Sequence, residues 1–105
     1  MDEKEKAEKK PVAVGDVLPL GQSDIGLVGN IVKVNGEGRL RRRLFDMGLT
    51  PGAEVFVRKR APLGDPIEIT LRGYELTLRK SEADFVDIKV TDISNVKQKA
   101  SEEEA

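Results

Sequence analysis

The sequence predicts a mainly β protein: a small SH3-like barrel of five strands, with one short helix between strands 1 and 2 and a single helical turn before the last strand. Three observations support this class. Several short segments alternate apolar and polar residues, helical periodicity appears in one stretch, and 105 residues suffice for one domain. Small sheets avoid exposed edges by curling closed. An OB-fold is the structural alternative, but its strands are usually longer and its helix falls between strands three and four.

Five segments carry the strand signal. In the clearest three, apolar side chains alternate with charged residues or threonine, which is typical of half-buried strands: residues 67–71, 74–78 and 86–90. Residues 55–57 begin a further strand, and residues 27–34 form the first one. Each segment is short, as expected for strands of a small barrel.

The dipeptide Arg72-Gly73 separates two of these strands and predicts a two-residue hairpin loop. Such a loop pairs apolar residues with apolar residues on one face: Leu71 with Tyr74, Ile69 with Leu76, and Ile67 with Leu78. A slip of one residue would destroy every one of these matches, so the register is well specified.

Helical periodicity appears between residues 37 and 47. Leu40, Leu44 and Met47 fall at positions i, i+4 and i+7, which is one stripe of a helix. Gly48 stands where a C′ glycine ends a helix. Farther along the chain, Ser81 precedes Glu-Ala-Asp and is the predicted N-cap of the single helical turn.

The two ends of the chain differ in composition from its middle. Residues 1–11 are mostly charged, and residues 92–105 end in an acidic run. Such segments bury too little apolar surface to offset the entropy of ordering. We therefore expect a charged N-terminal tail over 1–11, the barrel over 12–91 and a flexible acidic tail over 92–105.

The chain contains no cysteine and no histidine. Disulfides, the usual zinc ligands and the commonest general base are therefore all missing, so we expect neither an enzyme nor a tight metal site. A weak iron site would have oxygen ligands only. The net charge of −1 gives no general attraction to nucleic acid. No apolar run reaches the length of a membrane helix, which favours a cytoplasmic protein.

Two features are candidates for binding a partner. Arg41, Arg42 and Arg43 form a basic cluster that either contacts phosphate or an acidic partner, or is simply the solvated face of the helix. Leu63 lies at the predicted tip of a loop between Pro62 and Gly64, beyond easy reach of the core. It either anchors a partner or folds back to cap the barrel.

Several blocks of residues, spread over about residues 17–90, resemble the FeoA family. One runs from Gly38 to Gly48 and continues as Leu49-Thr50-Pro51-Gly52. The other blocks are Arg60-Ala61-Pro62-Leu63-Gly64-Asp65-Pro66 and Leu78-Arg79-Lys80 with Glu82 and Ala83. Their order is specific, because generic small barrels do not share it.

The resemblance implies an SH3-like barrel that acts as a small cytoplasmic accessory of ferrous iron transport. Its implied partner is FeoB, a membrane transporter with a cytoplasmic GTP-binding domain. We expect the barrel to dock on the cytoplasmic face of FeoB and tune uptake, with no membrane insertion and no cofactor. The contact candidates are Arg60, Leu63, Asp65, Met47 and Leu49, although Met47 and Leu49 fit the core better.

Two alternatives belong to other functional classes. An arginine from Arg41, Arg42 or Arg43 could act in trans on the GTPase site of the transporter, as arginine fingers do. This would make the protein an activator of the FeoB GTPase. The other alternative is a weak nucleic-acid-binding small barrel, which the near-zero net charge disfavours.

Overall fold

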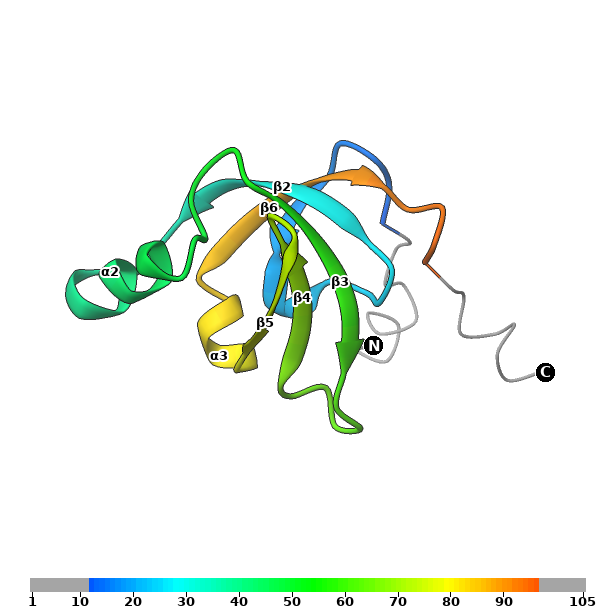
Figure 1. The fold of residues 1–105 in the computed structure, drawn as a ribbon. Helices are drawn as coiled ribbons and strands as arrows, with labels where there is room; N and C mark the ends of the chain where they lie inside the picture. The colour runs from blue at the N-terminus through cyan, green and yellow to red at the C-terminus, as the bar shows by residue number, and fades with distance from the viewer. Residues whose placement is uncertain (1–11, 97–105) are drawn as a thin grey trace, which may run out of the picture.

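The computed structural model describes residues 12–96 and contains one six-stranded antiparallel sheet in the order β1-β6-β2-β3-β4-β5 (Figure 1). The sheet curls around its apolar side chains, so the predicted fold class is confirmed. The elements follow one another as β1 (Val17–Pro19), the 3-10 turn η1 (Leu20–Gln22), β2 (Val28–Val34), α2 (Gly38–Asp46), β3 (Glu54–Arg60), β4 (Ile67–Leu71), β5 (Tyr74–Leu78), α3 (Lys80–Ala83) and β6 (Val86–Asp92).

The strand count differs from the expected five, because β1 is an additional strand. It has three residues, too few to show alternation, and it forms by pairing antiparallel with β6, with Val17 opposite Lys89 and Pro19 opposite Asp87. The strand therefore depends on a partner that lies far away in the sequence. As a consequence, the helix α2 lies between the second and third strands rather than between the first and second.

The β4–β5 hairpin has the predicted register, in which Leu71 faces Tyr74, Ile69 faces Leu76 and Ile67 faces Leu78. Both loop residues have positive φ, +50° at Arg72 and +87° at Gly73. Positive φ at both positions is the signature of a type I′ turn, whose twist matches that of the flanking strands.

The core is continuous and consists of side chains from all strands but β1, together with residues of the helices and connecting segments. Its fully buried larger members are Leu20, Leu27, Ile31, Leu44, Leu49, Val55, Val57, Ile67, Ile69, Leu71, Leu78 and Ile88. Burial of each such side chain stabilises the fold by about 1.5–3 kcal/mol relative to exposure. This core keeps the sheet curled and sets the positions of the loops that join its strands.

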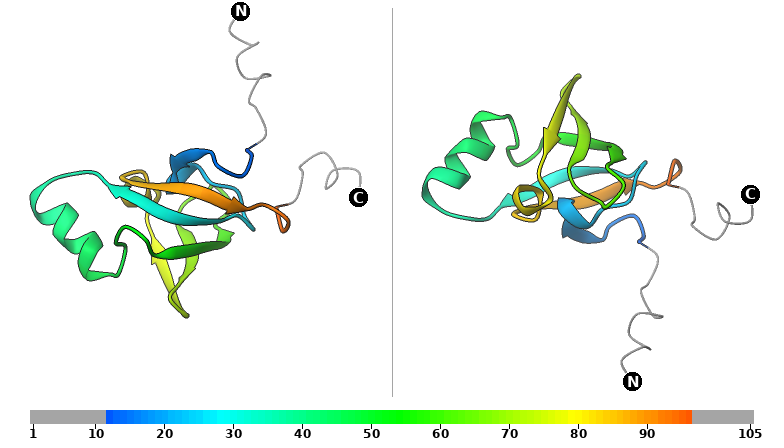
Figure 2. Two further views of the ribbon diagram at one scale, coloured as in Figure 1. Left: turned by 90° about the horizontal axis from the view of Figure 1, so that it is seen from above. Right: turned by 90° about the horizontal axis from the view of Figure 1, so that it is seen from below.

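The helix α2 ends as its sequence predicts. The N–H of Leu49 donates to the carbonyl of Leu44 at 3.1 Å, and the N–H of Gly48 donates to that of Phe45 at 2.9 Å. This pair of bonds is a Schellman motif, and Leu44 and Leu49 provide its apolar contact in the core. Both views in Figure 2 show that the rest of α2 stands clear of the barrel.

The single helical turn α3 is present, but Ser81 is not its N-cap. Arg79 occupies that position, and Ser81 lies exposed inside the turn. The N–H of Arg79 donates to Glu82 Oε1 at 3.0 Å, and the N–H of Lys80 donates to Asp65 Oδ1 at 2.8 Å. The capping carboxylate thus comes from the distant β3–β4 loop, which local sequence does not indicate.

The packed part of the chain extends slightly past the expected boundary at residue 91. Asp92 belongs to β6, and Ile93 and Val96 pack partly buried against the core. The Asp92 carboxylate accepts the backbone N–H of Ser94 at 2.9 Å, which together with the Ser94 hydroxyl keeps the pKa of Asp92 below its ordinary value. The predicted N-terminal tail, residues 1–11, and residues 97–105 of the tail predicted over 92–105 lie outside the described residues.

Candidate partner-binding surface

The loop between β3 and β4, residues 61–66, presents Leu63 to solvent. The side chain is 95% exposed, so it does not fold back to cap the barrel. Two backbone bonds close the loop: the N–H of Ala61 donates to the carbonyl of Pro66 at 3.0 Å, and that of Gly64 donates to Ala61 at 2.7 Å. An apolar side chain is therefore held away from the core on a closed loop.

Arg60 and Asp65 flank Leu63, and both contact neighbouring elements of the fold. The Arg60 guanidinium donates through Nη2 to the carbonyl of Gly21, and its Nε is buried without a partner among the described residues. Asp65 accepts the N–H of Lys80 at 2.8 Å and remains exposed. These contacts tie both ends of the loop to the barrel, so both residues position the loop that carries Leu63.

The other two contact candidates lie at the end of α2, and one of them is corrected by the structure. Leu49 is completely buried, because its side chain is the apolar contact of the Schellman motif, and it therefore cannot touch a partner. Met47 is half-buried against the core, and its carbonyl accepts the hydroxyl of Tyr74 at 2.8 Å. The core explanation considered for both residues fits their positions.

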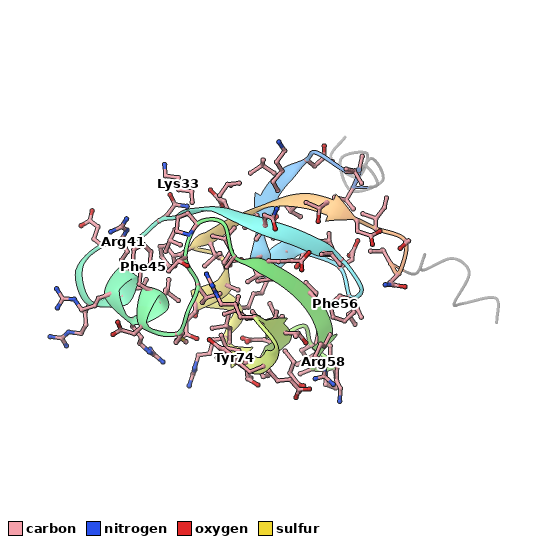
Figure 3. All side chains as sticks on the ribbon, turned by 45° about the horizontal axis from the view of Figure 1, so that its top comes forward. Lys33, Arg41, Phe45, Phe56, Arg58 and Tyr74 are labelled. Atoms are coloured by element: carbon pink, nitrogen blue, oxygen red, sulfur yellow. The ribbon has the colours of Figure 1, made fainter. Side chains whose placement is uncertain are left out.

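The three arginines of α2 are exposed but differ in their surroundings. Arg41 donates through Nε to the carbonyl of Val34 at 3.3 Å. Its guanidinium lies 4.7 Å from the centre of the Phe45 ring, and Figure 3 shows the two side chains next to each other. Arg43 pairs with Glu82 at 3.1 Å. Arg42 has no hydrogen bond or ion pair within residues 12–96, so its guanidinium is the one available to a ligand.

A shallow cavity of about 460 Å³ lies beside β5. Its lining residues are Arg43, Asp65, Pro66, Thr77, Leu78, Arg79 and Glu82. Two of these, Arg43 and Asp65, were candidates from sequence, whereas Thr77, Arg79 and Glu82 were not. The cavity collects residues from α2, the β3–β4 loop, β5 and α3, and no local motif signals such an assembly.

Two kinds of feature are absent from residues 12–96. No group of three or more acidic side chains lies close enough together to hold a metal ion. No helix in this part of the chain is both long and apolar enough to cross a membrane.

Comparison with known proteins relates this barrel to one family. The FeoA domain model matches residues 18–90. A fusion protein of Porphyromonas gingivalis strain W83, Fe(2+) transport protein A joined to the Fe(2+) transporter FeoB, is 33% identical over 60 residues. That match covers 57% of this chain but only 7% of the fusion protein, so the chain spans a small part of that relative.

Solved structures agree in fold. An FeoA-like protein from Clostridium acetobutylicum is 37% identical, with a TM-score of 0.66 over 75% of this chain and 90% of the other. Stenotrophomonas maltophilia FeoA, a procaryotic SH3 domain protein complexed with zinc, is 23% identical, with a TM-score of 0.59 over 75% of this chain and 94% of the other; this likeness shows the fold alone. Because the family model spans β1 to β6, the chain belongs to the FeoA domain family.

Proposed function

We propose that the protein is a non-catalytic accessory of ferrous iron uptake that docks on the cytoplasmic face of a FeoB-type transporter and tunes it. The exposed Leu63 on its closed loop is the observation that carries this proposal. The Porphyromonas gingivalis relative supports the choice of partner, because that protein joins Fe(2+) transport protein A and the transporter FeoB in one chain.

The expected strength of the contact follows from the area that it would bury. Transfer of a fully exposed leucine side chain into an apolar pocket is worth about 1.5–3 kcal/mol, or roughly 10- to 100-fold in affinity. The loop is already closed by its own backbone bonds, so little additional ordering opposes binding. Leu63 is therefore the side chain whose loss should weaken docking most.

The test is co-purification of the protein with the FeoB transporter of the same organism. Leu63→Asp should reduce the bound fraction at least about tenfold, because it places a charge where an apolar contact is expected. Val14→Asp is the matched control. Val14 is also an exposed apolar residue, 60% accessible, but it lies in the turn before β1, at the opposite end of the molecule from the β3–β4 loop (Figure 1).

Equal binding by wild type and Leu63→Asp would refute the role of the loop. If neither binds the transporter with any nucleotide present, the docking proposal itself fails. Circular dichroism of each variant shows whether the barrel remains folded, which is expected because both substitutions change exposed residues.

A second candidate function is activation of the transporter GTPase by an arginine supplied in trans. Arg42 supports it, since its side chain is exposed and unpaired within residues 12–96 on a helix that stands clear of the barrel (Figure 2). Arginine fingers accelerate GTP hydrolysis by roughly 10³–10⁵-fold. Arg42→Ala should then abolish stimulation of hydrolysis, whereas Arg41→Ala and Arg43→Ala should reduce it less. Unchanged stimulation by Arg42→Ala, or no stimulation by the wild type, rejects this function.

A further inference from the structure

The two outer strands of the sheet differ in how well they resist pairing with another chain. β1 has three residues and ends in Pro19, which blunts that edge. β5 has five residues, contains no proline and pairs only with β4. Among residues 12–96, no backbone hydrogen bond joins β5 to any other element. The edge of β5 is therefore open.

The hairpin register identifies the backbone groups that are open. In a hairpin with a type I′ loop, the two residues that flank the loop exchange hydrogen bonds, and every second pair after them does the same. Tyr74, Leu76 and Leu78 therefore bond to β4. The N–H and C=O groups of Glu75 and Thr77 point the other way, to the free edge.

Apolar surface accompanies this edge. On β4, the inward residues Ile67, Ile69 and Leu71 are completely buried. Of their partners on β5, only Leu78 is equally buried, whereas Leu76 is half-buried and Tyr74 is 45% exposed. The inner apolar row thus continues to the edge of the sheet but is not covered there. An added strand would cover it.

The cavity of about 460 Å³ lies along the C-terminal half of this edge, and α2 contributes Arg43 to its lining. One contact joins the end of α2 to β5, and a second joins α2 to α3. The Tyr74 hydroxyl donates to the carbonyl of Met47 at 2.8 Å, and Arg43 pairs with Glu82 of α3 at 3.1 Å. These contacts restrict movement of α2 relative to β5 in the unbound protein, which lowers the cost of filling the space between them.

One cation beside the cavity is available to a ligand. Both carboxylates that line it are already engaged: Glu82 by Arg43 and by the N–H of Arg79, and Asp65 by the N–H of Lys80. The exposed guanidinium of Arg79 has no ion-pair partner within the described residues. The formal charges that line the cavity cancel, but the Arg79 guanidinium is available to pair with a carboxylate of a ligand.

We propose that β5 binds an extended segment of a partner protein, which adds to the sheet as a further strand between β5 and α2. The segment alternates apolar and polar residues and carries a carboxylate that pairs with Arg79. Backbone bonds to Glu75 and Thr77 would supply affinity, and the carboxylate would supply selectivity, as in other cases of strand addition. The site differs from the Leu63 loop and does not depend on which protein the loop contacts.

The test titrates isotope-labelled protein with synthetic hexapeptides and follows backbone amides by NMR. The probe is acetylated, amidated and alternates valine with threonine, with one threonine replaced by glutamate. Amides of residues 74–79 and of the facing part of α2 should shift on binding. A lysine in place of the glutamate should weaken binding roughly fivefold to tenfold at low salt, because it faces Arg79. A probe with N-methylated backbone amides should not bind.

Two variants locate the site on the protein. Thr77→Pro removes an N–H that faces the free edge and is not used in the β4–β5 ladder, so it should weaken binding about tenfold without unfolding the strand. Arg79→Glu should reverse the preference between glutamate and lysine probes. Lys89→Glu, the same charge change on an exposed residue of β6, should not alter it.

The N-methylated probe keeps the proposal testable even if Thr77→Pro fails to fold, since it changes only the ligand. Absence of shifts in β5 at several millimolar peptide would overturn strand addition, as would equal binding of the N-methylated probe. A variant that no longer binds the peptide probe but still binds the transporter would show that the β5 site is separate from docking through Leu63.

Discussion

At Gly48 the backbone has a φ of +99°, and a Cβ atom there would lie 2.6 Å from the Tyr74 hydroxyl oxygen and 3.2 Å from Leu71 Cδ2. Position 48 must have positive φ because a left-handed residue closes the Schellman motif at the end of α2. Position 48 must also lack a side chain, because Tyr74 of β5 approaches the helix end closely. A single glycine thus allows both the helix cap and the contact between helix and hairpin.

Gly48→Ala should lower the free energy of unfolding by more than the roughly 1 kcal/mol that a left-handed alanine alone costs, because the methyl group must displace Tyr74. Gly52→Ala is the matched control: its φ is +94°, but a Cβ there meets nothing within 4 Å. Urea unfolding of the two variants gives the difference. Equal losses would mean that the approach of Tyr74 imposes no constraint.

Local sequence predicts some roles of single residues and misses others. Gly48 was predictable as a helix end, since the cap involves residues within one turn. Its contact with Tyr74 was not, because the two residues meet only after the sheet has curled. Asp65 is similar: its loop position was evident, but its role as the carboxylate that caps α3 depends on a contact across the fold.

Among the elements, the hairpin and β1 mark the two extremes of predictability. The β4–β5 register follows from a two-residue loop and alternating side chains, which all lie within twelve residues of sequence. β1 owes its existence to β6, about 70 residues away in the sequence, and three residues carry no periodic signal. Local pattern therefore predicts elements that are defined by their neighbours in sequence.

The attachment of α2 is a property of elements rather than of single residues. The helix is held by Leu44 in the core and by the Tyr74 hydroxyl on the Met47 carbonyl. Loss of a single hydrogen bond typically costs about 0.5–1.5 kcal/mol.

Tyr74→Phe should therefore speed amide hydrogen exchange around the end of α2, at residues 46–49, several-fold while leaving β2 and β6 protected. Hydrogen exchange followed by NMR tests this. Unchanged exchange at these residues would show that Leu44 and Leu49 alone hold the helix end, and the cavity beside β5 would then not depend on Tyr74.

At the scale of the whole molecule, sequence located the loop that carries Leu63 but not the groove beside β5. The loop is contiguous, so its turn-forming residues and its leucine could be recognised together. The groove draws on four separate elements, and its existence depends on how α2 is fixed against the sheet. Leu49 was named as a contact candidate although it fitted the core better, and it is completely buried.

The exposed loop is the feature through which we propose that the barrel acts on ferrous iron uptake. A loop closed by its own backbone bonds and a protruding leucine are suited to binding a partner, and membership of the FeoA domain family supports the proposal that this partner acts in ferrous iron uptake. The same barrel leaves β5 open, so one molecule could contact the loop partner and a strand-forming segment together.

Uptake of radioactive ferrous iron by cells that lack the gene tests this claim most directly. Deletion should change the initial uptake rate, and wild-type protein or the Val14→Asp control should restore it. Leu63→Asp, expressed at the same level, should leave the rate at that of the deletion strain. Uptake that is unaffected by deletion, or fully restored by Leu63→Asp, would contradict the account.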